Sequence, residues 1–236
     1  MLKKNEWPDR LMIVRHGYSY AQKQRHEAEK SGALQFELGM PEEDAPLIRR
    51  GKRQARARGK WLAQLPADQK PTVVLVSPFL RARQTAERVL AASGMLLENL
   101  TIKIDPRLGE LRHGDLTYFT TKGRAQFRHE VQKMDEVGEL EYRQPNGENR
   151  WDVVARLRPL VEELRNVYAG ERVLMVSHSA TIRCLRYLIE NLTEGEFLAI
   201  VRGSDAANCS VTSYVRDSKR GLLVPDAVPY FGDPLQ

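Results

Sequence analysis

The chain has 236 residues, enough for one α/β domain with a sizeable core but only marginally enough for two, so we expect a single domain over residues 1–236. Its 42% hydrophobic and 29% charged residues exclude disorder of the whole chain, and no apolar run approaches the ~20 residues that cross a bilayer. The excess of 37 basic over 31 acidic residues, a net charge of +6, favours anionic partners.

The start of the chain and its cysteines add further expectations. Residues 1–10 carry charges but no apolar run, so we expect no secretory signal, no membrane partner and a cytoplasmic location. Cys184 and Cys209 are the only cysteines, and neither lies in a CxxC or Cys/His ligand spacing. This argues against a disulfide framework and a zinc site, and we expect no metal.

The first half of the chain alternates apolar runs with segments of helical composition. The first strand is followed by a polar segment to residue 30 and then by a loop to residue 45 that is rich in Gly, Pro and acidic residues. In chain order, the elements predicted here are a strand at 11–15, a helix at 47–65, a strand at 72–76, a helix at 81–92 and a strand at 101–104.

The helix predicted at 47–65 carries a dense positive run at residues 49–60. One interpretation is a patch that binds nucleic acid. The other is the solvated face of an amphipathic helix, whose apolar side consists of Leu47, Ile48, Ala55, Trp61 and Leu62. We favour the solvated face and do not expect a nucleic acid partner, because the basic run has no interleaved aromatic residues on which bases could stack.

The second half of the chain departs from this alternation and then resumes it. Residues 105–150 have few apolar repeats, several Gly and Tyr residues and charges of both signs, which is typical of a lid or insertion within a wound sheet. The elements predicted after it are a helix at 151–168, a strand at 173–176, a helix at 180–191 and a strand at 209–215, the last at or near an edge of the sheet. The expected fold is therefore a three-layer α/β/α arrangement with a mostly parallel central sheet and an inserted lid.

Three of the predicted strands lead into residues that can handle a phosphate group. The first runs into Arg15 and His16, the second leads to Arg81, and the strand at 173–176 leads to His178. Since parallel strands bring their carboxyl ends to one edge of a sheet, these residues should meet in one crevice. Arginine supplies bidentate positive charge and a neutral imidazole supplies a nucleophile, so the pattern predicts phosphoryl transfer to a histidine.

Each of these signals has a plainer interpretation when it is taken alone. An Arg-His-Gly tripeptide occurs by chance in many proteins, and a lone histidine at a strand end is more often a hydrogen-bonded structural residue. The charged pair Arg15-His16 directly follows a buried strand, where charge is costly unless the strand end faces a crevice. Gly17 would allow the backbone to bend closely around a phosphate.

These residues and their neighbours resemble the histidine phosphatase superfamily, the group that contains cofactor-dependent phosphoglycerate mutases, fructose-bisphosphatase domains and broad-specificity phosphatases. Six motifs occur in the order of that family and cover most of residues 11–183. They are the strand and RHG segment at 11–22, the helix start at 46–55, the SP-x-x-RA-x-QTA-like segment at 77–86, the acid-bearing loop at 106–114, the P-x-GE-like stretch at 145–156 and the SH-containing segment at 173–183.

The resemblance implies a role for each matching residue. His16 would accept the phosphoryl group as a phosphohistidine, and Arg15, Arg81 and His178 would hold its oxygens. Glu110 would protonate the leaving oxygen and then activate water. Residues implied to contact phosphate or substrate are Gly17, Ser19, Gln22 and Ser179.

Some acidic and polar positions leave alternatives open. Glu110 has a plainer interpretation as a surface loop acid beside two arginines, and Glu148 is expected to be structural, gripping a backbone group or an arginine. Gln22 stands where many relatives have Asn, and Ser179 replaces a usual Gly, which bears on the shape of the substrate more than on catalysis.

The resemblance implies three possible activities. We favour a metal-independent phosphomonoester hydrolase that needs no cofactor and acts on a small phosphorylated metabolite. The first alternative, a cofactor-dependent phosphoglycerate mutase, needs further basic groups in the lid, for which the candidates are Arg112, Lys122, Arg124 and Arg128. The second alternative is a catalytically inactive phosphate-binding scaffold. A homodimer is compatible with the resemblance, because dimers are common among relatives.

Overall fold

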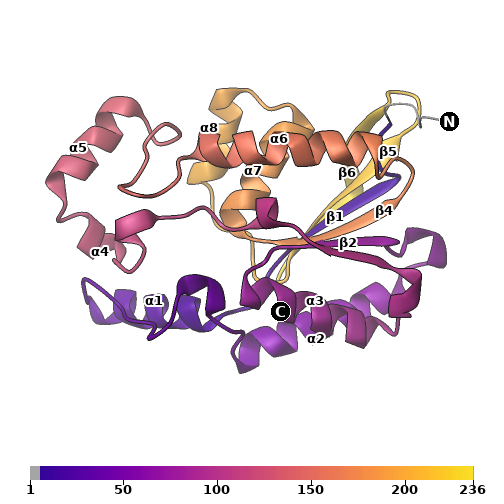
Figure 1. The fold of residues 1–236 in the computed structure, drawn as a ribbon, viewed down its shortest axis with the longest axis horizontal. Helices are drawn as coiled ribbons and strands as arrows, with labels where there is room; N and C mark the ends of the chain where they lie inside the picture. Colours follow the sequence, from indigo (N-terminus) through magenta and orange to yellow (C-terminus); the bar gives the residue numbers. More distant parts are fainter. Residues whose placement is uncertain (1–5, 236) are drawn as a thin grey trace.

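The structure, a computed structural model, describes residues 6–235, apart from the side chains of residues 227–231. Residues 1–5, half of the charged start on which the expectation of no secretory signal rests, lie outside the described residues, as does Gln236. The described chain contains a six-stranded sheet in the order β3-β2-β4-β1-β5-β6 (Figure 1). The strands are β1 (Arg10–Arg15), β2 (Val73–Val76), β3 (Thr101–Ile104), β4 (Arg172–Ser177), β5 (Val211–Asp217) and β6 (Leu222–Phe231).

Four parallel strands form the part of the sheet that leads to the predicted site. β1 pairs with β4, β4 with β2 and β2 with β3, while β5 and β6 continue the sheet in antiparallel pairing. In this register Val14 of β1 lies beside Val176 of β4, and Val176 lies beside Val76 of β2. The three strands therefore end level with one another, and the residues that follow them begin side by side.

Helices cover both faces of the sheet (Figure 1). The helices on one face are α2 (Arg49–Gln64) and α3 (Leu80–Ser93), and those on the other are α6 (Arg150–Asn166), α7 (Ser179–Glu190) and α8 (Glu194–Arg202). Alternate side chains of β1 enter two separate cores, Met12 and Val14 on the α2 side and Leu11 and Ile13 on the α6 side. The predicted α/β fold class, with a mostly parallel sheet between helical layers, is confirmed.

The basic helix predicted at 47–65 is α2, and most of its positive run is exposed. Ala55 and Leu62 are buried in the core, as expected for an amphipathic helix with a solvated face. Arg58 is an exception, because its buried guanidinium donates from Nε to the Cys209 carbonyl at 2.8 Å. This arginine ties α2 to the start of β5.

Outside residues 105–150, three α-helices or strands are absent from the sequence prediction. The polar segment before residue 30 forms α1 (Tyr20–Ser31), in which only Ala21 and Ala28 are buried, so no apolar periodicity marks it. Its start is instead defined by a capping box between Ser19 and Gln22. The other two are α8 and β6, and β6 lies outside β5, so the strand expected at or near an edge is second from the edge.

Residues 105–150, the proposed lid, contain two short helices, α4 (Thr121–Arg124) and α5 (Arg128–Val137), that project beyond the sheet on the side of α1 (Figure 1). The amide of Thr120 donates to the Leu34 carbonyl at 3.0 Å, which joins the segment to the loop after α1.

None of the helices in residues 6–235 is long and apolar enough to cross a membrane. Single turns of 3-10 helix complete the list: η1 (Glu42–Asp44), η2 (Ala67–Gln69), η3 (Leu97–Asn99), η4 (Pro106–Leu108) and η5 (Gly114–Leu116).

Candidate active site

His16 follows directly after β1 and is 3% exposed. Its backbone amide donates to the Ser177 carbonyl of β4 at 2.9 Å, which continues the parallel ladder by one residue. Its ring Nδ1 lies 2.8 Å from the Gly17 carbonyl oxygen. A carbonyl can only accept, so Nδ1 carries the proton and Nε2 keeps its lone pair. This assigned tautomer leaves Nε2 as the nucleophilic atom.

His178 lies beside His16 at the end of β4. The centroids of the two rings are 5.0 Å apart, and His178 is fully buried. Its Nε2 lies 2.7 Å from the hydroxyl of Ser77, the residue that follows β2. Its Nδ1 has no hydrogen-bond partner among the described residues. If the Ser77 hydroxyl donates to Nε2, then Nδ1 carries a proton that can be offered to an oxygen of a bound phosphate.

Arg81, in the first turn of α3, points at the nucleophile and is 3% exposed. Its Nε donates to His16 Nε2 at 3.3 Å. Its other nitrogens contact Glu42 in η1, with Nη1 at 2.8 Å from the carbonyl oxygen and Nη2 at 3.4 Å from the carboxylate. The acidic loop before α2 therefore supplies this guanidinium with two acceptors.

Arg15 reaches the same cavity from the last position of β1. Its Nη2 lies 3.6 Å from the carboxylate of Asp205, and its Nη1 donates to the Ala206 carbonyl. The Asp205 carboxylate also pairs with Arg183 at 2.9 Å and accepts from the Ser179 hydroxyl at 2.7 Å. The Nε of Arg15 has no hydrogen-bond partner in the described part of the chain.

Both imidazoles are neutral at physiological pH. Burial lowers the pKa of His16 well below its usual value, and the neighbouring guanidiniums of Arg81 and Arg15 lower it further. Burial also lowers the pKa of His178, with Arg81 as the next largest cause. A neutral His16 is the form that can attack phosphorus.

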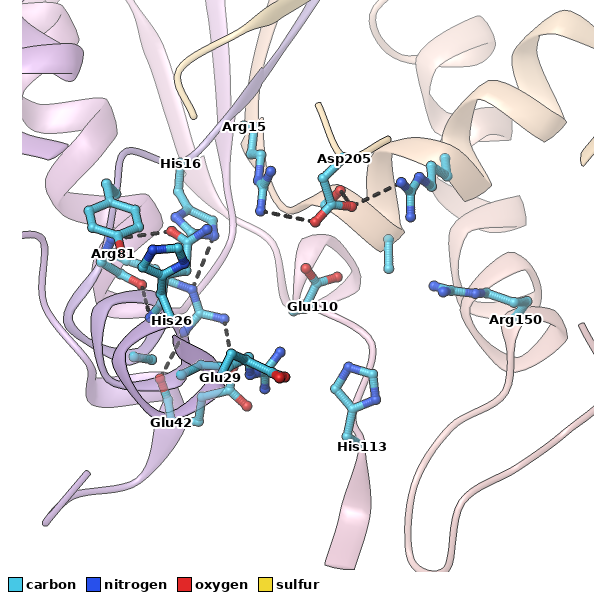
Figure 2. Close-up of a pocket in the computed structure, with 18 residues that line it drawn as sticks. Arg15, His16, His26, Glu29, Glu42, Arg81, Glu110, His113, Arg150 and Asp205 are labelled. Carbon is cyan, nitrogen blue, oxygen red and sulfur yellow. Dashed lines mark hydrogen bonds and ion pairs between the residues drawn. The ribbon is translucent and has the colours of Figure 1, made fainter. Parts of the chain in front are cut away.

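Glu110 lies in the loop after η4 and lines the cavity, where Figure 2 shows it between the His16 side and the Arg150 side. Its Oε1 accepts from the Leu111 amide at 3.0 Å. Burial raises the pKa of this carboxyl group, although the Leu111 amide, Arg81 and Arg15 oppose the shift. A carboxyl group with a raised pKa suits a proton donor and does not fit the alternative of a solvated surface acid.

The loop that carries Glu110 is held in place by Glu148. One carboxylate oxygen of Glu148 accepts from Arg156 Nε and the other from the Arg112 amide, each at 3.1 Å. Arg156 in turn donates from Nη2 to the Gly109 and Glu110 carbonyls at 3.0 and 3.3 Å. Glu148 therefore makes both of the structural contacts considered from the sequence, to a backbone group and to an arginine.

Of the four further positions implied to contact phosphate or substrate, three line the cavity and one does not. Ser19 and Gln22 line the cavity while capping α1, and the Gln22 side-chain oxygen accepts from Asn208 at 3.0 Å. Ser179 lines it at the start of α7. Gly17 lies behind the cavity, because its amide donates to Thr85 Oγ1 at 3.0 Å and α2 packs directly against it.

A second group of cationic side chains faces the cavity from the side away from His16. Arg25 of α1 and Arg150 of α6 line it together with His113, and Figure 2 shows the Arg150 guanidinium extending into the space. Burial and the guanidiniums of Arg124, Arg25 and Arg150 lower the pKa of His113 to about 3. Burial and Arg25 lower the pKa of Arg124 to about 10. These groups form what we call the arginine cluster: Arg25, Arg124 and Arg150.

No carboxylate within residues 6–235 comes within ion-pairing distance of the arginine cluster. Arg25 and Arg124 donate only to backbone carbonyls, those of Thr117 and Phe119, at 3.2 and 3.3 Å. The buried Nη1 of Arg150 has no hydrogen-bond partner in the described part of the chain. Because like charges that are half-buried together repel, the cluster favours the binding of an anion. Of the lid residues considered from the sequence, Arg112, Lys122 and Arg128 are exposed, and only Arg124 belongs to the cluster.

The cavity between the two cationic sides has a volume of about 380 Å³, enough for a small phosphorylated metabolite. In the part of the chain that the structure describes, no group of three or more His, Cys, Asp or Glu side chains is arranged to hold a metal ion. The residues that could hold a ligand here are cationic or neutral donors, so the ligand they fit is an anion.

Several polar residues of the site were not identified from the sequence: Ser77, Glu42, Asp205, Arg25, His113 and Arg150. Ser77 directly follows a buried strand, a position that could have marked it in the same way as His16. Glu42 and Asp205 lie in loops remote from any strand end, and only their spatial pairing with Arg81 and Arg15 makes them part of the site. Loop acids of this kind give no sequence signal.

The fold and the site together define an α/β protein with a buried histidine pair and two arginines at the carboxyl edge of a parallel sheet. The chain belongs to the histidine phosphatase superfamily (branch 1), whose family model matches residues 11–225. The resemblance on which the sequence prediction rests is therefore confirmed.

Individual relatives have different activities. A 2,3-bisphosphoglycerate-dependent phosphoglycerate mutase from Sinorhizobium fredii is 31% identical over 157 residues, which cover 66% of this chain and 72% of the relative. A mycobacterial glucosyl-3-phosphoglycerate phosphatase has a similar structure, with a TM-score of 0.66 and 24% identity, and the match covers 95% of this chain and 97% of that one. An alpha-ribazole phosphatase from Shigella flexneri is also similar, with a TM-score of 0.66 and 21% identity, and the match covers 89% of this chain and 92% of that one. At these identities the two structures bear on the fold alone.

Proposed function

We propose that the protein is a phosphomonoester hydrolase that acts through a phosphohistidine on His16 and needs no metal. The observation that carries this proposal is the contact of Arg81 Nε with His16 Nε2 at 3.3 Å, beside a second neutral imidazole 5.0 Å away. A guanidinium at that distance can bind the oxygens of a phosphoryl group that His16 attacks.

In the first step, the Nε2 lone pair of His16 attacks phosphorus in line with the ester oxygen. The P–N bond forms as the P–O bond to the leaving group breaks, and the proton of Glu110 goes to the departing oxygen. Arg15, Arg81 and the Nδ1–H of His178 bind the three remaining oxygens and stabilise the charge that develops on them.

In the second step, water replaces the leaving group. Glu110 is now a carboxylate and takes a proton from the water as its oxygen attacks phosphorus. The P–N bond breaks, the electron pair returns to His16 Nε2, and inorganic phosphate leaves. Proton donation and acceptance by one carboxyl group require a pKa above the usual range, which burial gives Glu110.

Assay of p-nitrophenyl phosphate with the wild type and His16→Ala tests this proposal. We expect the wild type to turn over and to form an acid-labile phosphoenzyme, and His16→Ala to do neither. We also expect EDTA to leave the rate unchanged, because no step uses a metal. Equal, negligible rates for both proteins would instead support the scaffold alternative, and a large loss with EDTA would contradict the metal-independent mechanism.

The arginine cluster favours one further candidate, a phosphoglycerate mutase, and it also suits a phosphatase whose substrate has a second anionic group. A mutase must hold a doubly anionic acceptor, and three arginines without carboxylate partners are suited to its second charge. Assay of 3-phosphoglycerate with and without its bisphosphate separates the two, since a mutase yields the isomer and a phosphatase yields inorganic phosphate.

The role of the arginine cluster in binding a second anionic group can be tested with two substrates that share a carbon skeleton and differ in a carboxylate. For a phosphatase that uses the cluster, we expect Arg150→Gln to lower kcat/KM for 3-phosphoglycerate about 10-fold or more, by loss of a charge-assisted hydrogen bond, and to spare glycerol 3-phosphate. Arg128→Gln, an exposed arginine of α5, is the matched control. Equal effects of Arg150→Gln on both substrates would contradict a role in binding the second anion.

A further inference from the structure

The last described residues of the chain lie against α2. Arg58 Nη2 donates to the Gly232 carbonyl at 2.8 Å. The side chain of Asp233 is 5% exposed, and one of its oxygens accepts from Arg50 Nη2 at 3.0 Å and from Gln54 Nε2 at 2.8 Å. The contact with Arg50 is on the surface, whereas the contact with Gln54 is partly buried.

Gln54 connects Asp233 to the catalytic loop. Its Oε1 accepts from the Tyr18 amide at 3.0 Å, and the residue is 1% exposed. The Tyr18 amide belongs to the same peptide group as the Gly17 carbonyl, which accepts from His16 Nδ1 at 2.8 Å. The two ends of one planar peptide are thus held by Gln54 on one side and by the nucleophile's ring on the other.

The orientation of the Gln54 side chain decides whether this arrangement can form. In a trans peptide the N–H and C=O groups point in opposite directions, so fixing the Tyr18 N–H also fixes the Gly17 carbonyl toward His16. A glutamine amide can be turned so that either its oxygen or its nitrogen faces Tyr18. Asp233 accepts hydrogen bonds only, so it binds Nε2 and leaves Oε1 for Tyr18.

We propose that Asp233 is a positioning residue that acts through Gln54 to hold His16 in the tautomer with Nδ1 protonated and Nε2 free to attack. This inference rests on the proposed function. Without the carboxylate, the Gln54 amide can turn and the Gly17–Tyr18 peptide loses its fixed plane. Arg81 Nε, which donates to His16 Nε2 at 3.3 Å, is then the remaining contact that opposes a proton on Nε2, and part of the His16 rings carry their proton there. In that tautomer Nε2 has no lone pair and cannot attack phosphorus.

The first experiment compares Asp233→Ala with Arg50→Gln, which removes the other side-chain contact of Asp233 and leaves the Gln54 contact. We expect Asp233→Ala to lower kcat about 10-fold or more with KM nearly unchanged, because the nucleophile and not the phosphate site is disturbed. We expect Arg50→Gln to keep the wild-type kcat. Imidazole nitrogen NMR spectra should show one Nδ1–H form of His16 in the wild type and a mixture of tautomers in Asp233→Ala.

The second experiment tests rescue. In Gln54→Glu, one oxygen can still accept from Tyr18, but the other faces the Asp233 carboxylate, and the repulsion should lower kcat. Adding Asp233→Asn supplies an amide that donates to the new carboxylate, so the double variant should recover most of the wild-type kcat. A double variant that is slower than Gln54→Glu alone would overturn the inference.

The outcomes distinguish three cases: Asp233 positions His16, Asp233 only anchors the end of the chain to α2, or the proposed function itself is wrong. If Asp233→Ala keeps the wild-type kcat and His16 spectrum, or if it and Arg50→Gln lose activity and thermal stability equally, the inference is overturned. If the wild type forms no phosphohistidine, the proposed function fails. The NMR spectra still report the His16 tautomer in that case, so the coupling of Asp233 to His16 is tested independently.

Discussion

At the scale of single residues, burial shifts the pKa values of the ionisable groups of the site toward their neutral forms. Burial lowers the pKa of His16 and His178 and raises the pKa of Glu110, so two neutral bases and an acid with a raised pKa lie within reach of two guanidiniums. Glu42 and Asp205 pair with Arg81 and Arg15, whereas the arginine cluster has no carboxylate partner among the described residues. In the proposed mechanism, the neutral form of His16 is the nucleophile and the protonated form of Glu110 is the proton donor.

The role of Glu110 can be tested with substrates that differ in their leaving group. p-Nitrophenolate departs without a proton, whereas an alkoxide needs one. In Glu110→Gln we expect a burst of one equivalent of nitrophenolate followed by a stall, because the second step lacks its base. We expect alkyl phosphates to be slowed by about 100-fold or more already in the first step. Stopped-flow absorbance and phosphate release measure the two steps.

The exposed acid Glu43 provides the control for this experiment. Glu43→Gln removes a charge close to the site without removing a proton donor, and it should leave both steps unchanged. Normal steady-state turnover of p-nitrophenyl phosphate by Glu110→Gln would show that another group serves as the acid and base.

At the scale of elements, the site depends on how closely α2 approaches the loop after β1. A Cβ placed on Gly51 would lie 2.1 Å from the Tyr18 carbonyl oxygen and 2.6 Å from its amide nitrogen, and a Cβ on Gly17 would lie 2.6 Å from the Gly51 carbonyl oxygen. Only a pair of glycines allows this contact. The helix therefore lies directly against the peptide group whose carbonyl accepts the hydrogen bond from His16 Nδ1.

We expect Gly51→Ala to lower the free energy of unfolding by about 1–3 kcal/mol. Alanine gains about 1 kcal/mol in helix propensity over glycine, but the overlap with backbone atoms of Tyr18 costs more, because a backbone cannot move aside as a side chain can. Urea denaturation measures the difference. Gly195→Ala in α8 meets nothing within 4 Å and should be neutral or stabilising. Equal stability of the two variants would contradict the close contact.

The elements that could be predicted from sequence are those with a continuous apolar run or with apolar residues at helical spacing. The strands at 11–15, 72–76 and 173–176 were predicted to within a residue at each end, because parallel strands buried on both faces are apolar throughout. α1 was not predicted, because it packs through two alanines and lines the cavity with polar groups. The strand ends located His16, Arg81 and His178, whereas Ser77, Glu42 and Asp205 required the spatial arrangement.

At the scale of the whole molecule, three buried neutral histidines make stability depend on pH. His16, His178 and His113 have folded pKa values below the unfolded value of about 6.5, and that of His113 is about 3. Below about pH 6.5 the unfolded chain takes up protons that the folded chain does not, so the folded state loses stability as the pH falls toward 3. Glu110, whose pKa is raised, opposes this trend through one group.

We expect the free energy of unfolding to fall by up to about 1.4 kcal/mol per pH unit for each of these histidines below pH 6.5. Urea denaturation at several pH values between 7.5 and 5 measures the slope. His113→Gln should reduce the slope by the share of one histidine, whereas His129→Gln, at an exposed position on α5, should not change it. A stability that stays constant between pH 7 and 5 would show that the three imidazoles become protonated in the folded protein.

Arg81 pairs with Glu42 and Arg15 pairs with Asp205, so both guanidiniums of the site have a carboxylate counterion within the protein. A substrate ester must displace the Glu42 and Asp205 carboxylates before the two guanidiniums can bind its oxygens. A dianionic headgroup matches the charge of the two carboxylates together, whereas a singly charged sulfate ester or phosphodiester offers only half of it. Under the proposed function, these two acids therefore set a charge threshold that favours dianionic substrates.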